Sequence, residues 1–327
     1  MGTSQTVAVT GASGFVGRSV VRELLSRGHA VRSLVRDRAK AREVLPPPSD
    51  THTLVVGDVL DHRVMGELAA RCTAVIHLIG IIRERPPATF QKMHVDATAA
   101  AIAAAQGAGV KRYLHMSSLG ASDLGGTAYR TTKYQAERLV RASGLDWTIF
   151  RPGMIHGPQG EATEMFADLV AGHHPPYMFI PYFTRYEIDT RVPLGSATPT
   201  DPKVAPVSVV DVARAFAAAL DRPASIGEVY NLVGSETLTW PQMLTLYRDK
   251  TSAGNERISP WGVPSEVASK VALVASKIGL GHLLPFDEGM AIMGGQDSTG
   301  STDKATADLG IEFAPFSTSF AEYAGEI

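Results

Sequence analysis

A phenol and an ammonium group stand four residues apart at Tyr129 and Lys133. On an α-helix this spacing places both side chains on one face. A nearby cation favours the phenolate, so we expect Lys133 to lower the Tyr129 pKa from about 10 and make it a proton donor and acceptor. Ser117 and Ser118 could hold a substrate carbonyl or hydroxyl group, or could form a turn. These four residues are the candidate catalytic group.

A glycine-rich turn, TGASGFVG, occupies Thr10 to Gly17. Gly11 would turn the chain, Gly14 would leave backbone open to a pyrophosphate, and Gly17 would let the next helix approach the strand. Free N–H groups at that helix start favour an anion. Tight turns also collect glycine, but here a strand precedes the triplet, and an amphipathic helix and a second strand follow. The pattern predicts a dinucleotide-binding turn.

Two arginines, Arg36 and Arg38, follow the second expected strand. A protein specific for NAD usually ends this strand with a carboxylate, and here Val35 has that position. Two cations suit the 2′-phosphate of NADP. A solvated basic loop is the alternative, and Asp37 could serve NAD instead. The sequence therefore favours NADP(H) and leaves NAD(H) open.

Further cofactor contacts are expected where other strands end. Asp58 could accept a hydrogen bond from the adenine amino group or cap a helix, and Gly80 is small enough for adenosine to lie against backbone. The glycine- and proline-rich segment 151–158 suggests a rigid wall at the nicotinamide end. The expected cofactor-binding residues are Gly11, Ser13, Gly14, Phe15, Val16, Gly17, Arg36, Arg38, Asp58, Val59, Leu78, Gly80, Met116, Lys133, Pro152, Met154 and Ile155.

Other reactive side chains suggest no separate site. His156 could reach a substrate, although a lone histidine is more often structural. His173 and His174 resemble half of a metal site, but no acidic or cysteine cluster completes it, so we expect no metal. Cys72 is the single cysteine and is interpreted as a core or near-surface thiol rather than a nucleophile.

The composition argues against several classes of partner. A net charge of -2 without a lysine- or arginine-rich run predicts neither a nucleic-acid nor an anionic-membrane partner. No apolar stretch reaches about 18 residues, so we expect no transmembrane segment. The N-terminus lacks a positive region followed by an apolar run, and a cytoplasmic location is expected.

The elements that must position these residues alternate between strand and helix. Such alternation predicts an α/β fold, a doubly wound parallel Rossmann sheet with its ligand crevice where the strands end. The expected strands are 7–10, 30–35, 53–56, 74–78, 112–116 and 147–150, and the expected helices start near Phe15, Arg38, Arg63, Thr89 and Tyr129.

The rest of the chain is expected to form a smaller subdomain for a substrate or partner. Residues 172–206 are rich in proline and aromatic residues without a clear period, which favours a loop that acts as a lid or partner surface. The alanine-rich helix near 89–106 could pack on the sheet or form a homodimer face. We expect an NAD(P)-binding domain at 1–160 plus 205–233, and a subdomain at 161–204 plus 234–327.

Taken together, these segments resemble the short-chain dehydrogenase/reductase family in its extended and atypical branches. The resemblance rests on residues 10–17, Tyr129 with Lys133, 151–158 and 207–213. It is nearest to bacterial relatives of the NAD(P)H-binding accessory subunit of respiratory complex I, through 109–121 and 143–152.

The resemblance implies that Tyr129 is the general acid/base, that Lys133 binds the nicotinamide ribose, and that a serine helps to place the substrate. Two residues depart from the family pattern: Leu119 stands where extended members tend to have Ser or Thr, and His94 where the family often has Asn. Both departures weaken a catalytic interpretation and leave cofactor binding untouched.

Two functions therefore remain. The first is an NADP(H)-dependent oxidoreductase or epimerase that acts on a small hydroxyl, carbonyl or quinone-like compound, with the hydride chemistry supplied by the cofactor. The second is a non-catalytic NADPH-binding accessory or redox-sensing protein that docks a partner protein. The intact Tyr129 and Lys133 pair favours the enzyme.

Overall fold

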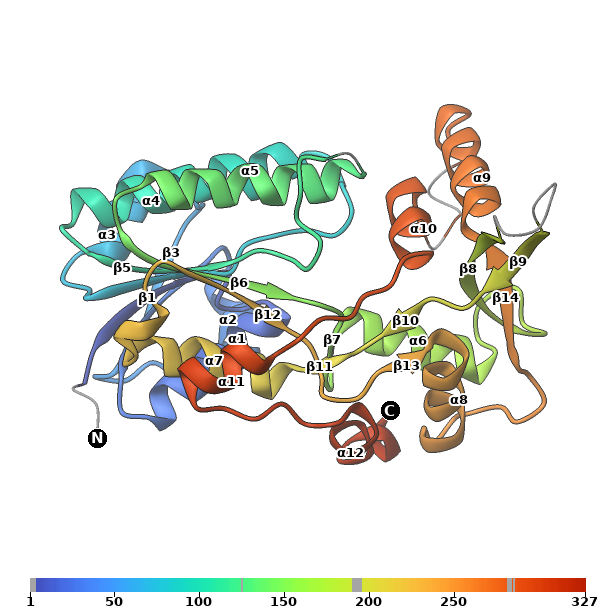
Figure 1. Ribbon diagram of the computed structural model, residues 1–327. Coiled ribbons are helices and arrows are strands. Elements are labelled where there is room, and N and C mark those ends of the chain that lie inside the picture. The colour runs from blue at the N-terminus through green and yellow to red at the C-terminus, as the bar shows by residue number, and fades with distance from the viewer. Residues whose placement is uncertain (1–3, 125, 190–195, 281–283, 285) are drawn as a thin grey trace. The chain divides into compact units, whose positions relative to one another are not determined.

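The computed structural model describes residues 4–124, 126–189, 196–280, 284 and 286–327 (Figure 1). The chain divides into two compact units. The first comprises residues up to 152 together with 207–233 and 301–313. The second comprises 153–206, 234–300 and 314–327.

The first unit is built on a seven-stranded sheet in the order β12-β6-β5-β4-β1-β2-β3. Every neighbouring pair is parallel. This arrangement confirms the predicted α/β Rossmann-like fold class. The strands are β1 (Thr6–Thr10), β2 (Ala30–Val35), β3 (His52–Val56), β4 (Ala74–His77), β5 (Arg112–Met116), β6 (Asp146–Pro152) and β12 (Glu228–Leu232).

Helices cover both faces of this sheet (Figure 1). α1 packs against α7, whereas α4 packs against α3 and α5 on the other face. Buried strands with helices on both sides are what the apolar runs predicted. The helices are α1 (Phe15–Ser26), α2 (Arg38–Val44), α3 (His62–Ala69), the π-helix η1 (Gln91–Asp96), α4 (Ala97–Gly107), α5 (Ala128–Ala142), α7 (Val209–Leu220), η2 (Pro223–Ser225) and α11 (Asp303–Leu309).

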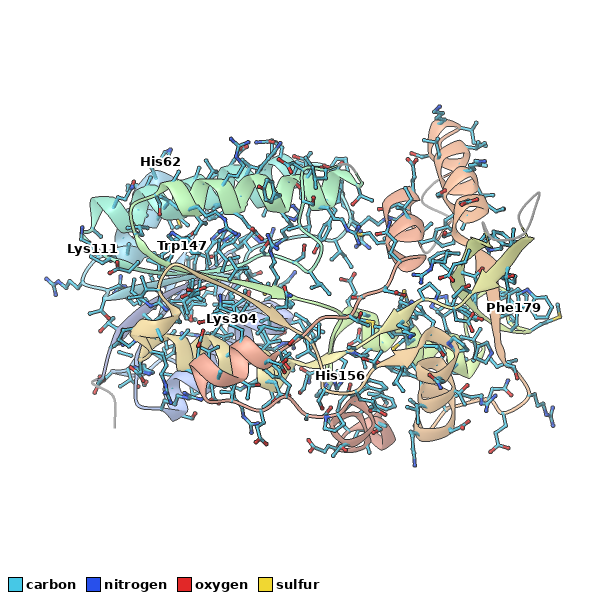
Figure 2. The ribbon with its side chains drawn as sticks, viewed as in Figure 1. His62, Lys111, Trp147, His156, Phe179 and Lys304 are labelled. Atoms are coloured by element: carbon cyan, nitrogen blue, oxygen red, sulfur yellow. The ribbon has the colours of Figure 1, made fainter. Side chains whose placement is uncertain are left out.

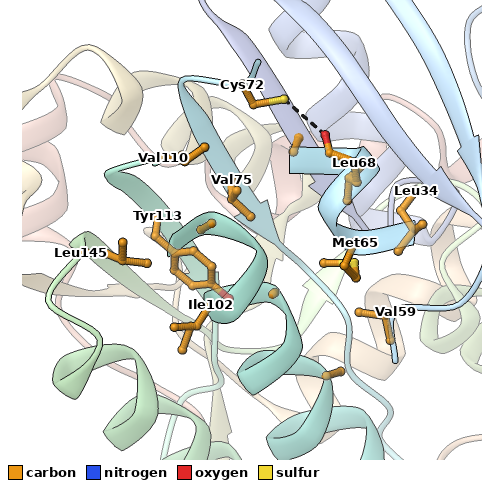
Figure 3. Close-up of a cluster of buried hydrophobic side chains, with 14 of the residues drawn as sticks. Leu34, Val59, Met65, Leu68, Cys72, Val75, Ile102, Val110, Tyr113 and Leu145 are labelled. Atoms are coloured by element: carbon orange, nitrogen blue, oxygen red, sulfur yellow. Dashed lines mark hydrogen bonds between the residues drawn. The ribbon is translucent and has the colours of Figure 1, made fainter. Parts of the chain in front are cut away.

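The core on the α4 face contains the single cysteine (Figure 3). Cys72 lies among Leu68, Val75 and Val110, and its thiol donates to the Leu68 carbonyl oxygen at 3.4 Å. Burial raises the pKa of the thiol to about 11. A protonated thiol in an apolar cluster is a packing group, in agreement with the sequence interpretation.

Buried polar contacts attach the late segments of the chain to this sheet. The Arg112 guanidinium on β5 donates to the Ala219 carbonyl at 2.8 Å and to Ser225 Oγ at 2.7 Å. The Tyr230 hydroxyl on β12 donates to the Asp308 carboxylate at 2.8 Å. The first unit therefore takes in residues 301–313, which the sequence boundaries assign to the other part of the chain.

The second unit contains a three-stranded sheet in the order β14-β8-β9, where β8 pairs with β9 antiparallel and with β14 in parallel. The prediction of an irregular loop over 172–206 is therefore wrong for 180–189, 196–200 and 203–204, which form strands, and it holds for 172–179, while 190–195 lie outside the described residues. The aromatic residues that suggested a lid are strand formers. The strands are β8 (Ile180–Asp189), β9 (Ser196–Thr200), β14 (Pro260–Pro264), β10 (Lys203–Val204) and β13 (Leu238–Thr239), with short segments β7 (Ile155–His156) and, in the first unit, β11 (Val207–Ser208).

An aromatic core holds the second unit together. Tyr247 and Phe320 have ring centroids 4.3 Å apart, and Phe166 packs against the same tyrosine.

None of the helices in the described ranges has the length and apolar content needed to cross a bilayer. The helices are α6 (Glu161–Ala171), α8 (Trp240–Lys250), α9 (Ser265–Lys277), α10 (Glu288–Gly294), α12 (Phe316–Ala321) and η4 (Ala324–Glu326).

Candidate cofactor and reaction site

The glycine-rich turn joins β1 to α1 with the tight packing that the sequence predicted. Gly11 has φ +71°, and the Gly14 N–H donates to the Gly11 carbonyl at 3.0 Å. A Cβ atom on Gly17 would lie 2.0 Å from the Gly11 carbonyl oxygen. Only glycine fits there, because α1 rests directly on the turn.

The first turn of α1 has backbone N–H groups that no side chain caps. Its N-cap is Gly14, which has no side chain to accept a hydrogen bond. Uncapped N–H groups and the helix dipole attract an anion. The turn therefore fits a pyrophosphate held by peptide nitrogens.

Asp37, which could have served NAD, is used to cap α2. Its carboxylate accepts hydrogen bonds from Ala39 N at 2.8 Å and from Lys40 N at 3.2 Å. Arg36 and Arg38 are exposed on either side of it. The end of β2 thus presents cations, while its carboxylate already has backbone partners.

Asp58 does not cap a helix. Its carboxylate accepts from Leu60 N at 2.8 Å and closes a local turn, whereas Asp61 caps α3 through Arg63 N and Val64 N. The helix-cap alternative for Asp58 is therefore wrong, and its contact with adenine stays a prediction. The nearby Val59 side chain is buried in the core.

Lys133 is buried beneath Gly80, with 3 % of its surface exposed. Its ammonium group donates to the Met116 carbonyl at 3.2 Å, and a Cβ atom on Gly80 would lie 2.6 Å from its Nζ. Gly80 thus makes room for the lysine, a role that the sequence did not suggest. Burial lowers the pKa of Lys133 to about 8, and the charge of Glu137 opposes this shift.

Tyr129 lies one helical turn before Lys133, yet its pKa moves opposite to our expectation. Burial raises the Tyr129 pKa above its ordinary value, and the nearby Ser118 hydroxyl and the charge of Arg130 offset this only in part. The prediction that Lys133 lowers the Tyr129 pKa is wrong, because desolvation outweighs the charges around the phenol. The phenol is therefore protonated at neutral pH.

Ser117 and Ser118 follow β5 with their hydroxyl groups buried. The Ser117 N–H donates to the Phe150 carbonyl at 2.7 Å, so the backbone continues along β6. Within the described part of the chain neither hydroxyl oxygen makes a hydrogen bond of regular geometry, and Ser118 is close enough to the Tyr129 phenol to lower its pKa. Buried hydroxyl groups normally have partners, so this pair is open to a hydrogen-bonding ligand.

His94 packs against the Tyr129 ring from the π-helix η1. The two rings meet edge to face with centroids 5.4 Å apart, and Phe90 stacks on His94 at 5.3 Å and meets the Tyr129 ring at 5.8 Å. The His94 ring nitrogens lie 2.9 Å from Thr132 Oγ1 and 3.0 Å from the Ile81 carbonyl oxygen. Burial lowers the pKa of His94 to about 3, so a neutral imidazole holds the phenol in place.

A buried ion pair below Lys133 was missed by the sequence analysis. Glu137 is fully buried and accepts two hydrogen bonds from Arg151, at 2.7 and 2.6 Å. This pair ties α5 to β6. Tyr129, Lys133 and Glu137 succeed one another at four-residue intervals, and that spacing was the available signal.

Two more buried histidines, His77 and His115, stack on adjacent strands with centroids 5.7 Å apart. Desolvation lowers the pKa of His77 to about 3 and that of His115 well below its usual range, and Lys133 lowers both further. Nothing in the sequence singled them out.

Three of the candidates, His156, Met154 and Ile155, belong to the second unit. His156 is buried, with its ring nitrogens 2.9 Å from the Tyr323 hydroxyl and 3.3 Å from Ser319 Oγ, so its place is structural (Figure 2). Met154 packs against the aromatic core, and Ile155 belongs to β7. Within the described ranges no three His, Cys, Asp or Glu side chains form a metal-binding group.

Comparison with known proteins gives the same domain. Residues 11–171 match the family model described as NAD(P)H-binding. The ceramide reductase of Caulobacter vibrioides is 37% identical over 153 residues, which are 46% of this chain and 47% of that protein. Subunit 9 of the NADH dehydrogenase [ubiquinone] 1 alpha subcomplex from Arabidopsis thaliana mitochondria is 29% identical over 74% of this chain and 56% of its own. The chain thus spans about half the length of these relatives.

Solved structures extend the likeness to the whole fold. The structure of gox2253 superposes with a TM-score of 0.71 and 26% identity, covering 98% of this chain and 96% of the other. The UDP-glucose 4-epimerase of Thermotoga maritima shares the fold alone, with a TM-score of 0.68 and 20% identity over 97% and 98% of the two chains. Residues 11–171 are therefore an NAD(P)H-binding domain, and the chain is similar in sequence to reductases and to complex I accessory subunits.

Proposed function

We propose that the protein is an NADP(H)-dependent oxidoreductase of the short-chain dehydrogenase/reductase type that reduces a small carbonyl or quinone-like compound. The observation that carries this proposal is the group of Tyr129, Lys133 and two buried serine hydroxyls that make no hydrogen bond of regular geometry with any described residue. A binding protein has no need for a half-buried phenol and a buried ammonium near buried serine hydroxyls, because burying polar groups is unfavourable. An epimerase reaction at the same site also needs Tyr129.

Each residue has a distinct task in this reaction. Ser117 and Ser118 donate hydrogen bonds to the substrate oxygen. Tyr129 then gives its proton to that oxygen, and Lys133 holds the ribose hydroxyls next to the phenol. Bound NADPH supplies the hydride to the carbonyl carbon, so that a carbonyl, NADPH and one proton become an alcohol and NADP⁺.

The protonated state of Tyr129 favours the direction of reduction. Burial keeps the phenol pKa above its ordinary value, so the hydroxyl group carries the proton that a reduction consumes. The oxidation of an alcohol would need the phenolate, which this site disfavours while the cofactor is absent. We therefore expect reduction to be faster than oxidation near neutral pH.

The preference for NADP(H) over NAD(H) is also proposed. Two observations support it. The Asp37 carboxylate, the one nearest the expected ribose, already caps α2, and Arg36 and Arg38 face solvent. Arginine binds a phosphate with paired hydrogen bonds.

A cytoplasmic location is proposed from the sequence alone.

The test is to follow NADPH absorbance with a panel of carbonyl compounds and quinones, using Tyr129→Phe as the control. The proposal expects oxidation of NADPH with at least one substrate and its loss in the variant. Oxidation that persists unchanged in Tyr129→Phe would remove Tyr129 as the proton donor. Bound nucleotide without turnover across the panel would contradict the reductase.

A non-catalytic accessory role is the second candidate. The match to the Arabidopsis complex I subunit covers 74% of this chain, more than the 46% matched by the ceramide reductase, and a Dictyostelium discoideum subunit of the same name covers 76%. In that role NADPH would be a structural or redox-sensing ligand and the second unit would bind a protein partner. Tight NADPH binding, no turnover and co-purification of a partner would establish it.

A further inference from the structure

Helix α9 in the second unit exposes a row of apolar side chains. Val267, Val271, Val274 and Ile278, the residue just past the helix end, are 54%, 50%, 56% and 64% exposed. At 100° per residue these four positions fall within one narrow arc of the helix. A contiguous row of exposed apolar side chains on one helix face marks an interaction surface.

The opposite side of α9 already packs against its own unit. Ala268 and Ala272 are buried, and the helix lies against α10 and β8. Small alanines let α9 approach these elements closely. The valine row is therefore additional to the face that folding buries.

Two lysines, Lys270 and Lys277, form one border of the row. Both are exposed, and both lie within about one quarter turn of Val274 on the helical projection. Glu266, in the first turn, is the single carboxylate on this exposed arc. The arc thus combines an apolar centre with a cationic edge, although the chain as a whole has a net charge of -2.

We propose that α9 binds an anionic lipid membrane, with the valine row in the interface and Lys270 and Lys277 at the headgroups. An amphipathic helix with an apolar stripe and lysines beside it lies along a bilayer surface rather than crossing it. Charge complementarity selects this occupant, because anionic headgroups match a lysine edge. A second copy of the same face would bring mainly lysines and few carboxylates to meet them.

This proposal departs from the composition-based expectation of no membrane partner. That expectation rested on the absence of lysine- or arginine-rich runs, whereas the present arc has two lysines seven residues apart and apolar side chains whose exposure only the structure shows. It does not rest on the proposed reaction, since α9 contains none of the candidate catalytic residues. Vesicle binding should persist in Tyr129→Phe.

The experiment is flotation of the full chain with vesicles of phosphatidylcholine alone or mixed with phosphatidylglycerol. We expect flotation with the mixed vesicles and a decrease as salt is added. The double variant Val271→Gln/Val274→Gln should bind at least about tenfold more weakly, because two buried apolar side chains are lost. Lys270→Gln/Lys277→Gln should lose about fivefold per lysine on mixed vesicles.

Val210→Gln is the matched control, because Val210 is a 48% exposed valine on α7, in the other unit. It should float like the unchanged chain, and thermal unfolding should show that all variants are folded. Equal binding by the valine variants and the control would overturn the proposal. A dimer that the valine variants dissociate, without flotation of the unchanged chain, would assign the face to a second copy and would also overturn it.

Discussion

The two ends of the expected cofactor crevice are built on different principles. At the phosphate end, the start of α1 consists of backbone, with glycine as its N-cap and no side-chain cap. At the reaction end, the start of α5 is capped by Thr127 and crowded by buried side chains from other segments. α2 and α3 resemble α5 in this respect, because Asp37 and Asp61 cap them.

The difference indicates which interactions depend on local sequence. Peptide nitrogens at α1 are held in place by the turn itself, so a short glycine pattern is enough to specify them. The Tyr129 phenol is held by His94 in the π-helix η1 and by Phe90 just before it, and Lys133 needs the space left by Gly80. The reaction end therefore depends on tertiary packing and is more sensitive to substitution of distant side chains.

The largest effect is expected at the phosphate end, from Gly17→Ala. The new methyl group would overlap the Gly11 carbonyl oxygen, so we expect a loss of at least about 3 kcal/mol in unfolding free energy and no measurable NADPH binding. Urea unfolding and calorimetric titration measure both. Gly66→Ala is the control, because its Cβ meets nothing within 4 Å and helix propensity should stabilise α3 by about 1 kcal/mol. Equal behaviour of the two variants would disprove the close packing of α1.

Tyr129→Phe should affect catalysis at the reaction end without affecting cofactor binding at the phosphate end. Removing the proton donor should lower kcat by about 100-fold to 10,000-fold and leave NADPH affinity unchanged. Single-turnover kinetics and titration provide the two values. A parallel loss of affinity would contradict this, because it would show that the phenol also contributes to binding NADPH.

Lys133→Met should stabilise the chain without cofactor while it weakens cofactor binding. The Lys133 pKa is about 8 in the folded chain against 10.5 for a free lysine, so the folded state binds fewer protons between these values. Stability should rise with pH through that window, and the cost of the buried charge is fully present below it. Below pH 8 we expect the variant to gain about 3 kcal/mol in unfolding free energy.

Urea unfolding of both chains across that pH window measures this gain. The rise with pH should disappear in the variant. An unchanged pH dependence would assign it to another group and would mean that Lys133 is not desolvated.

The double variant Arg36→Ala/Arg38→Ala should give the smallest effect. It tests the preference for NADPH over NADH. We expect about tenfold weaker NADPH binding and unchanged NADH binding, because charge-assisted hydrogen bonds to the 2′-phosphate are lost. Titration with both nucleotides measures the preference. Arg42→Ala is the control, since Arg42 is exposed in the last turn of the same helix. An equal loss for NADH would point to general electrostatic attraction.

The contrast between local sequence signals and tertiary packing also explains which features the sequence could predict. The limits of β2 and the start of α1 agree with the expected residues, because alternation and glycine spacing are local signals. The direction of the Tyr129 pKa shift could not be derived from a four-residue spacing, since burial comes from the whole unit. The Glu137 and Arg151 pair and the β8–β9 hairpin depend on contacts between distant segments.

The most direct test of the account is a crystal structure of the protein with NADPH. The account predicts pyrophosphate oxygens within about 3.2 Å of the backbone nitrogens that begin α1, at Phe15 and Val16. A nucleotide bound elsewhere, with these nitrogens facing solvent, would contradict it.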